Sequence, residues 1–92
     1  MAQRLGVLSG RGALEKDGDL LGAIDYSLEV FQTNGRKEST GVVAGNFGML
    51  VMAFEHGAVT LRLENAGEAR IIITKLNNDR AAIRVDGPIP GF

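Results

Sequence analysis

The sequence predicts an all-β fold, mainly antiparallel, built as a small six-stranded barrel or roll with one short helix between strands 3 and 4. Three observations predict it: segments that alternate apolar and polar residues, polar turn signals between them, and connections too short for crossover helices. A single sheet of this size buries its apolar face by closing or folding over. The 92 residues are expected to form one domain, residues 1–87, followed by an extended tail, residues 88–92.

The clearest predicted element is a hairpin in the second half of the chain. Residues 59–64 and 68–74 alternate with the period of half-buried strands. A three-residue loop, residues 65–67, would pair Leu63 with Ala69 and keep every apolar partner on one face. The last residue of that loop is a glycine, as the left-handed position of a three-residue hairpin loop favours.

A second polar turn follows this hairpin. With residues 77–79 as a three-residue loop, Ile73 faces Ile83, and the buried face stays apolar across three strands. A two-residue turn made by the two asparagines is the alternative. It would place a charged side chain on the apolar face, so the three-residue loop is preferred.

The first half of the chain is expected to contribute three strands. Residues 5–15 and 21–32 form the first two, and a short third strand spans residues 40–44. Glycines interrupt the first of these segments. Glycines inside a strand pattern indicate bulges or sharp coiling of the strand.

Residues 46–57 have two interpretations. As a helix, the segment has Asn46 as its N-cap and Gly57 just past its end. The apolar face of that helix would be Phe47, Leu50, Val51 and Phe54. As a strand, the segment would run between two hairpin loops and leave outward Leu50, Met52 and Phe54. We prefer the helix.

Composition narrows the class of protein. The net charge of −1 gives no whole-molecule attraction to nucleic acid or to anionic lipid. The chain contains no cysteine, so it forms neither disulfides nor thiolate metal sites. We expect no signal segment, because a polar, arginine-containing stretch follows Met1, and the longest apolar run is too short to cross a bilayer. We expect a cytoplasmic protein that does not bind membranes.

No catalytic or metal-binding motif stands out. The single histidine, His56, lies in a turn and is expected to be solvated, while Asp17 and Asp19 read as turn residues rather than calcium ligands. No serine sits in a Gly-x-Ser-x-Gly elbow, and the glycine spacing matches no phosphate-binding loop. The sequence therefore predicts no enzyme activity, no cofactor and no metal site.

The predicted registers bring arginines together on the outward face of the last three strands. Arg62 would stand opposite Arg70, with Arg84 in the neighbouring row. Like charges opposite each other are unfavourable, so something should offset them. Acidic neighbours would give a solvated mixed-charge face, whereas an anion would make Arg62, Arg70 and Arg84 binding residues.

The function expected from these observations is that of a bacterial-type module for protein interaction, including self-association. Apolar residues in excess of what a small barrel buries mark the expected interaction surface: Met49, Met52, Phe54, Ile89 and Phe92. The predicted partners are a second copy of the chain, giving a homodimer, and an unidentified protein. The alternative function is binding of an anion, a nucleotide or nucleic acid through the three arginines. Because aromatic residues do not interleave with those arginines, no nucleic-acid stacking platform is expected.

Overall fold

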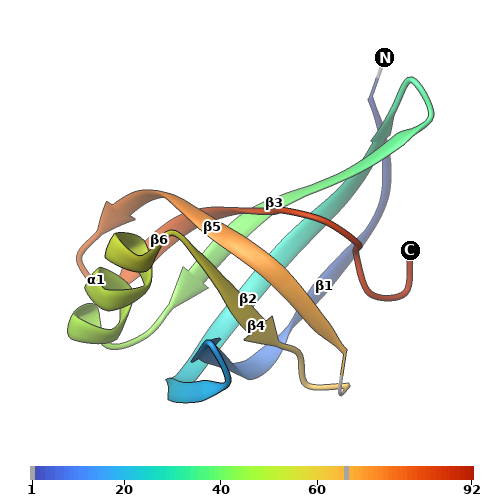
Figure 1. Ribbon diagram of the computed structural model, residues 1–92. Helices are drawn as coiled ribbons and strands as arrows, with labels where there is room; N and C mark the ends of the chain where they lie inside the picture. The colour runs from blue at the N-terminus through green and yellow to red at the C-terminus, as the bar shows by residue number, and fades with distance from the viewer. Residues whose placement is uncertain (1, 66) are drawn as a thin grey trace.

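The computed structural model describes residues 2–65 and 67–92. Its elements in chain order are β1 (Gln3–Lys16), β2 (Asp19–Thr33), β3 (Arg36–Ala44), α1 (Phe47–His56), β4 (Ala58–Arg62), β5 (Glu68–Asn77) and β6 (Arg80–Val85). The six strands close into an antiparallel barrel in the order β1-β2-β3-β6-β5-β4 (Figure 1). The predicted fold class is therefore confirmed, including the helix between strands 3 and 4. Within the described residues, no helix has the length and apolar character needed to cross a membrane.

The barrel consists of two three-stranded meanders joined by α1. Two seams close it, one between β1 and β4 over Ala13–Glu15, and one between β3 and β6 over Thr40–Ala44. Both seams are short compared with β1, β2 and β3. These three strands therefore continue past the barrel as an arm, which ends at the β2–β3 turn (Figure 1).

Inward-facing residues of all six strands and one side of α1 fill the barrel. The fully buried side chains include Leu14, Leu28, Val43, Leu50, Leu61 and Ile71. Glycines at inward positions allow strands to approach closely: a Cβ on Gly12 would collide with the backbone oxygen of Arg62. One register shift between β1 and β2 falls beside Gly6 of the first strand, as predicted. The other falls beside Gly22 of β2, whereas Gly10 and Gly12 pair in regular register.

The β4–β5 hairpin keeps the predicted face but not the predicted loop. Leu61 pairs with Ala69, and Leu63 donates a backbone hydrogen bond of 2.7 Å to the oxygen of Gly67. The predicted pairing of Leu63 with Ala69 is therefore wrong, and the loop lies one residue earlier than expected. Ala66 of the predicted loop lies outside the described residues. A register change of two residues leaves the apolar side chains on the same face, which is why alternation alone did not reveal it.

The β5–β6 hairpin has the predicted register and a different turn. Ile73 pairs with Ile83, as expected. The strands continue to a closing pair of Asn77 and Arg80, so the turn has two residues instead of three. The shorter turn leaves one extra residue in β5, and a register shift between Ile73 and Lys75 accommodates it. A β-bulge in β5 therefore gives the register that the sequence analysis explained by a longer loop.

Helix α1 is capped as predicted, but it buries a different side. The Asn46 side chain accepts a hydrogen bond of 3.2 Å from the backbone N–H of Met49, and Gly57 ends the helix with a φ of 98°. The buried residues are Met49, Leu50 and Ala53, so the predicted face containing Phe47 and Phe54 is wrong. Gly22 and Gly45 are compatible with this rotation, because a Cβ on either would lie 2.9 Å from the Met49 side chain. The missing side chains leave room for Met49 against the barrel.

The C-terminal tail folds back over the barrel instead of running extended. Ile89 is only 9% exposed, and the N–H of Phe92 donates to the oxygen of Ile89 at 3.1 Å. The Phe92 ring lies 3.0 Å from where a Cβ on Gly6 would stand. Lys37 Nζ donates a hydrogen bond of 3.1 Å to the Phe92 backbone oxygen. The tail therefore covers the end of the barrel that faces the arm.

Candidate functional site

The first predicted site residue, Arg62, belongs to an ion-pair cluster. Glu68, not Arg70, stands opposite Arg62, so the predicted pair of facing arginines is wrong. Arg62 Nη2 lies 2.9 Å from Glu15 Oε1 and 3.2 Å from Glu68 Oε2. The hydrogen bond from Arg62 lowers the pKa of the Glu15 carboxyl, and the same contact raises the pKa of Arg62. The guanidinium of Arg62 is thus already used within the protein.

The other two predicted arginines lie on different strands and have different neighbours. Arg70 on β5 stands opposite Thr60, and its backbone oxygen accepts a hydrogen bond of 2.7 Å from the Asp86 N–H. Arg84 on β6 stands opposite Ile72 on one side and Thr40 on the other. All three arginines lie on the outward face of β4, β5 and β6, with Arg70 diagonal to Arg62 and to Arg84 instead of directly opposite either of them. Of the three, Arg84 lines a hollow.

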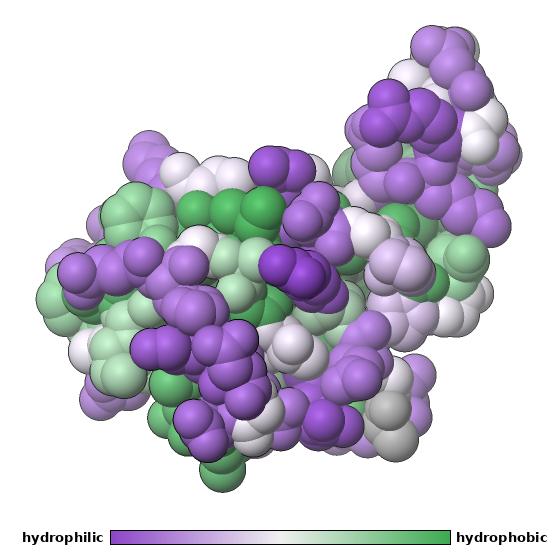
Figure 2. All heavy atoms as spheres, viewed as in Figure 1, coloured by the Kyte–Doolittle hydropathy of each residue, from purple (hydrophilic) through white to green (hydrophobic). Residues whose placement is uncertain are grey.

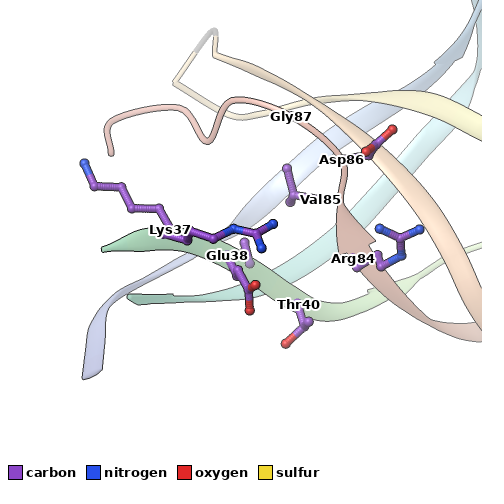
Figure 3. Close-up of a pocket in the computed structure, with 9 residues that line it drawn as sticks. Lys37, Glu38, Thr40, Arg84, Val85, Asp86 and Gly87 are labelled. Atoms are coloured by element: carbon purple, nitrogen blue, oxygen red, sulfur yellow. The ribbon is translucent and has the colours of Figure 1, made fainter. Parts of the chain in front are cut away.

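That hollow opens where β3 and β6 separate. The ladder between them ends at Thr40 and Arg84, while β3 continues to Arg36 with no strand among the described residues paired on that side. The resulting space has a volume of about 440 Å³ and is lined by residues 36–40 and 84–87. Figure 3 shows these two segments facing each other across the gap. We call this space the β3–β6 hollow.

One lining residue of the β3–β6 hollow carries a polar group without a partner. Ser39 is 2% exposed, and its Oγ makes no hydrogen bond with any described residue. Buried hydroxyls in folded proteins are nearly always hydrogen-bonded. Sequence reasoning missed Ser39, together with Arg36 and Lys37. A single serine in an alternating strand gives no signal that its hydroxyl will be enclosed.

The second candidate surface is the outer side of α1. Phe47, Val51 and Phe54 form one row along the helix, because they are spaced four and three residues apart. Phe47 is 53% and Phe54 47% exposed, with the half-buried Val51 between them. We call this row the α1 stripe. Figure 2 shows mostly hydrophilic side chains over the arm and a mixture of hydrophobic and hydrophilic ones over the end that carries α1.

The predicted interaction residues divide between exposed and buried positions. Phe54 is part of the α1 stripe. Met52 is 51% exposed and lies on the opposite flank of α1. Met49 and Ile89 are buried within the protomer, which removes them from its surface. Phe92 is 37% exposed and packs on Gly6 as part of the folded-back tail.

Neither a protein-family model, nor a curated protein, nor a solved structure matches this chain. Its function is therefore inferred from its own surfaces. Two of them stand out on physical grounds: the α1 stripe, because it exposes aromatic side chains, and the β3–β6 hollow, because it contains an unpartnered hydroxyl among charged groups.

Proposed function

We propose that the protein is a non-enzymatic interaction module that forms a homodimer through the α1 stripe. The observation that carries this proposal is the half exposure of Phe47 and Phe54 on one side of the helix. Burying two aromatic side chains of this kind is a strong driving force for association. The barrel does not use them, because Met49, Leu50 and Ala53 already fill the contact between α1 and the strands.

The symmetry of the α1 stripe favours a second copy of the chain as the partner. Its order of phenylalanine, valine and phenylalanine reads the same in both directions. In an antiparallel packing about a two-fold axis, Phe47 would meet the partner's Phe54, and Val51 would lie near the axis. An isologous interface requires this kind of self-complementary surface.

The charges along α1 are also complementary to a second, antiparallel copy. The first turn of α1 contains no acidic residue to interact with the positive end of the helix dipole. The last turn carries Glu55, which is exposed. Antiparallel packing would bring the Glu55 of each copy toward the N-terminus of α1 in the other copy. Each copy would then supply the negative charge that the first turn of the other copy's helix lacks.

Sedimentation over a range of protein concentrations tests the proposal. The wild-type protein should sediment as a dimer that dissociates on dilution. Phe54→Ser should weaken the dimer by about tenfold or more, since the loss of one buried aromatic contact at a hot spot exceeds about 1.4 kcal/mol. The matched control is Met52→Ser, which removes an equally exposed apolar side chain from the other flank of α1.

The control defines the outcome that contradicts the proposal. If Met52→Ser dissociates the dimer as strongly as Phe54→Ser, the α1 stripe is not the contact. A wild-type protein that stays monomeric at high concentration would exclude self-association altogether. Circular dichroism and melting curves of both variants establish that each has kept the fold.

A further inference from the structure

We propose that the β3–β6 hollow binds a small phosphate monoester that also carries hydroxyl groups, of the sugar-phosphate class. The binding groups come from both strands that border the hollow. Arg36 and Ser39 lie on β3, and Arg84 lies on β6. This site is separate from the α1 stripe and does not depend on the homodimer.

The cationic side chains of the hollow are the first reason. Arg36 and Arg84 both line it, and in the part of the chain that the structure describes neither forms an ion pair with a carboxylate. Lys37 lines it as well, although its Nζ is hydrogen-bonded to the Phe92 backbone oxygen. Two guanidinium groups from separate strands suit a phosphate, whose oxygens accept paired hydrogen bonds in the geometry that arginine offers.

The unpartnered hydroxyl of Ser39 is the second and independent reason. Ser39 lines the same hollow, is 2% exposed, and its Oγ has no hydrogen-bond partner among the described residues. An enclosed hydroxyl without a partner lowers the stability of the free protein. The Oγ has almost no surface open to solvent, so an oxygen of a ligand seated in the hollow would supply the missing partner as the segments that border the hollow move apart.

The carboxylates of the hollow narrow the ligand class. Glu38 and Asp86 line it beside the arginines, and Figure 3 places them on β3 and at the end of β6 respectively. Two carboxylates repel a bare phosphate dianion but accept hydrogen bonds from hydroxyl groups. A ligand that joins a phosphate to several hydroxyls satisfies both kinds of group, whereas inorganic phosphate satisfies only the arginines.

The size of the hollow agrees with a ligand of this kind. Its volume is about 440 Å³. Binding sites for small molecules range from about 300 to 1,000 Å³. A sugar phosphate suits a site in the lower part of that range. A polymer would be too large to enter the hollow and would contact only the rim of the hollow.

NMR titrations of the isotopically labelled protein test the proposal with three probes: ribose 5-phosphate, inorganic phosphate and ribose. We expect ribose 5-phosphate to shift the backbone amides of residues 36–40 and 84–87 and to bind more tightly than inorganic phosphate. Ribose alone should bind more weakly than either, and added salt should weaken both phosphate probes. If no probe shifts these amides, or if the shifts lie elsewhere, the site is wrong. If inorganic phosphate binds as tightly as ribose 5-phosphate, the hydroxyl-bearing ligand class is wrong.

Three variants separate this site from general attraction of anions. Arg84→Gln should weaken ribose 5-phosphate binding by about tenfold or more, as the loss of a hydrogen bond to a charged group implies. The matched control is Arg70→Gln, which removes an exposed cation from the neighbouring strand outside the hollow and should leave binding unchanged. Ser39→Ala should weaken binding severalfold while the melting temperature stays the same or rises. A fall in binding with Arg70→Gln equal to that with Arg84→Gln, or a marked drop in melting temperature with Ser39→Ala, would overturn the proposal.

Discussion

Arg62 on β4 donates two hydrogen bonds to Glu15 on β1, from Nε to Oε2 at 3.1 Å and from Nη2 to Oε1 at 2.9 Å. This two-point contact spans the β1–β4 seam, one of the two seams that close the barrel. Only Ala13–Glu15 of β1 pair with β4, so the backbone ladder at this seam is short. The side-chain contact therefore adds to the closure at the place where the strands have the fewest paired residues.

The first prediction concerns the pH dependence of folding. The pKa of Glu15 lies below its ordinary value of 4.5, because the carboxylate accepts hydrogen bonds from Arg62. A carboxyl whose pKa is lowered in the folded state stabilises the protein above its unfolded pKa, and that stabilisation is lost as the pH falls through the folded pKa. We expect the wild-type protein to be more stable than Glu15→Gln at pH 7. This advantage should shrink from about pH 4.5 downward, as urea unfolding at a series of pH values would show.

The partner variant identifies the source of this effect. Arg62→Gln removes the donor and should abolish the same pH-dependent part of the stability. The double variant should lose no more of that part than either single variant, because both act on one contact. A difference between wild type and Glu15→Gln that does not change with pH would contradict this account of the seam.

The second prediction concerns the close approach of β1 and β4. Gly12→Ala places a Cβ against the backbone oxygen of Arg62, which has no freedom to move aside. We expect a loss of about 2–3 kcal/mol in the free energy of unfolding, as for overpacking in a core. Gly6→Ala is the matched control in the same strand. Its Cβ would meet the ring of Phe92 at 3.0 Å, and the tail can shift, so the loss should stay below about 1 kcal/mol. Equal losses would show that strand contact does not explain Gly12.

The third prediction concerns the start of α1. Asn46→Ala removes the acceptor of the Met49 N–H and should lower the free energy of unfolding by about 1 kcal/mol. Asn46→Asp keeps an acceptor at the same position and adds a negative charge at the helix N-terminus, so it should be neutral or slightly stabilising. Chemical denaturation measures both. A neutral Asn46→Ala variant would mean that packing of Met49, Leu50 and Ala53 alone holds the helix in place.

Alternation and cap residues were sufficient to predict the architecture from the sequence. The strands near Leu61 and Ile73 show period-two patterns, and Asn46 and Gly57 bracket a helical length. Alternation determines which face is buried, but registers that differ by two residues bury the same face. The sequence therefore does not distinguish them, and the predicted β4–β5 loop lies one residue too late. The helix face was missed for a different reason. The observed face places Met49 in space that Gly22, distant in sequence, leaves open.

The β3–β6 hollow could not be predicted, because it depends on where one ladder ends. β3 continues past Thr40, whereas β6 ends at Val85 and the chain turns at Gly87, which has a φ of 120°. Neither strand shows in its own sequence that its partner will separate from it. Of the residues that line the hollow, Arg84 alone was predicted from the sequence as a binding residue. The reason was that the predicted registers placed Arg84 on the same face as Arg62 and Arg70.

The central claim, a two-fold dimer through the α1 stripe, is tested most directly by disulfide trapping. The natural chain has no cysteine, so a single introduced cysteine reports one position. Val51→Cys lies near the proposed axis and should form a disulfide-linked dimer on mild oxidation, since the two sulfurs would approach within bonding reach. Met52→Cys, one residue further and on the other flank of α1, should cross-link far more slowly. Rapid cross-linking of Val51→Cys alone, read on a non-reducing gel, is the predicted result. Equal or faster cross-linking of Met52→Cys, or none in either variant, would contradict the claim.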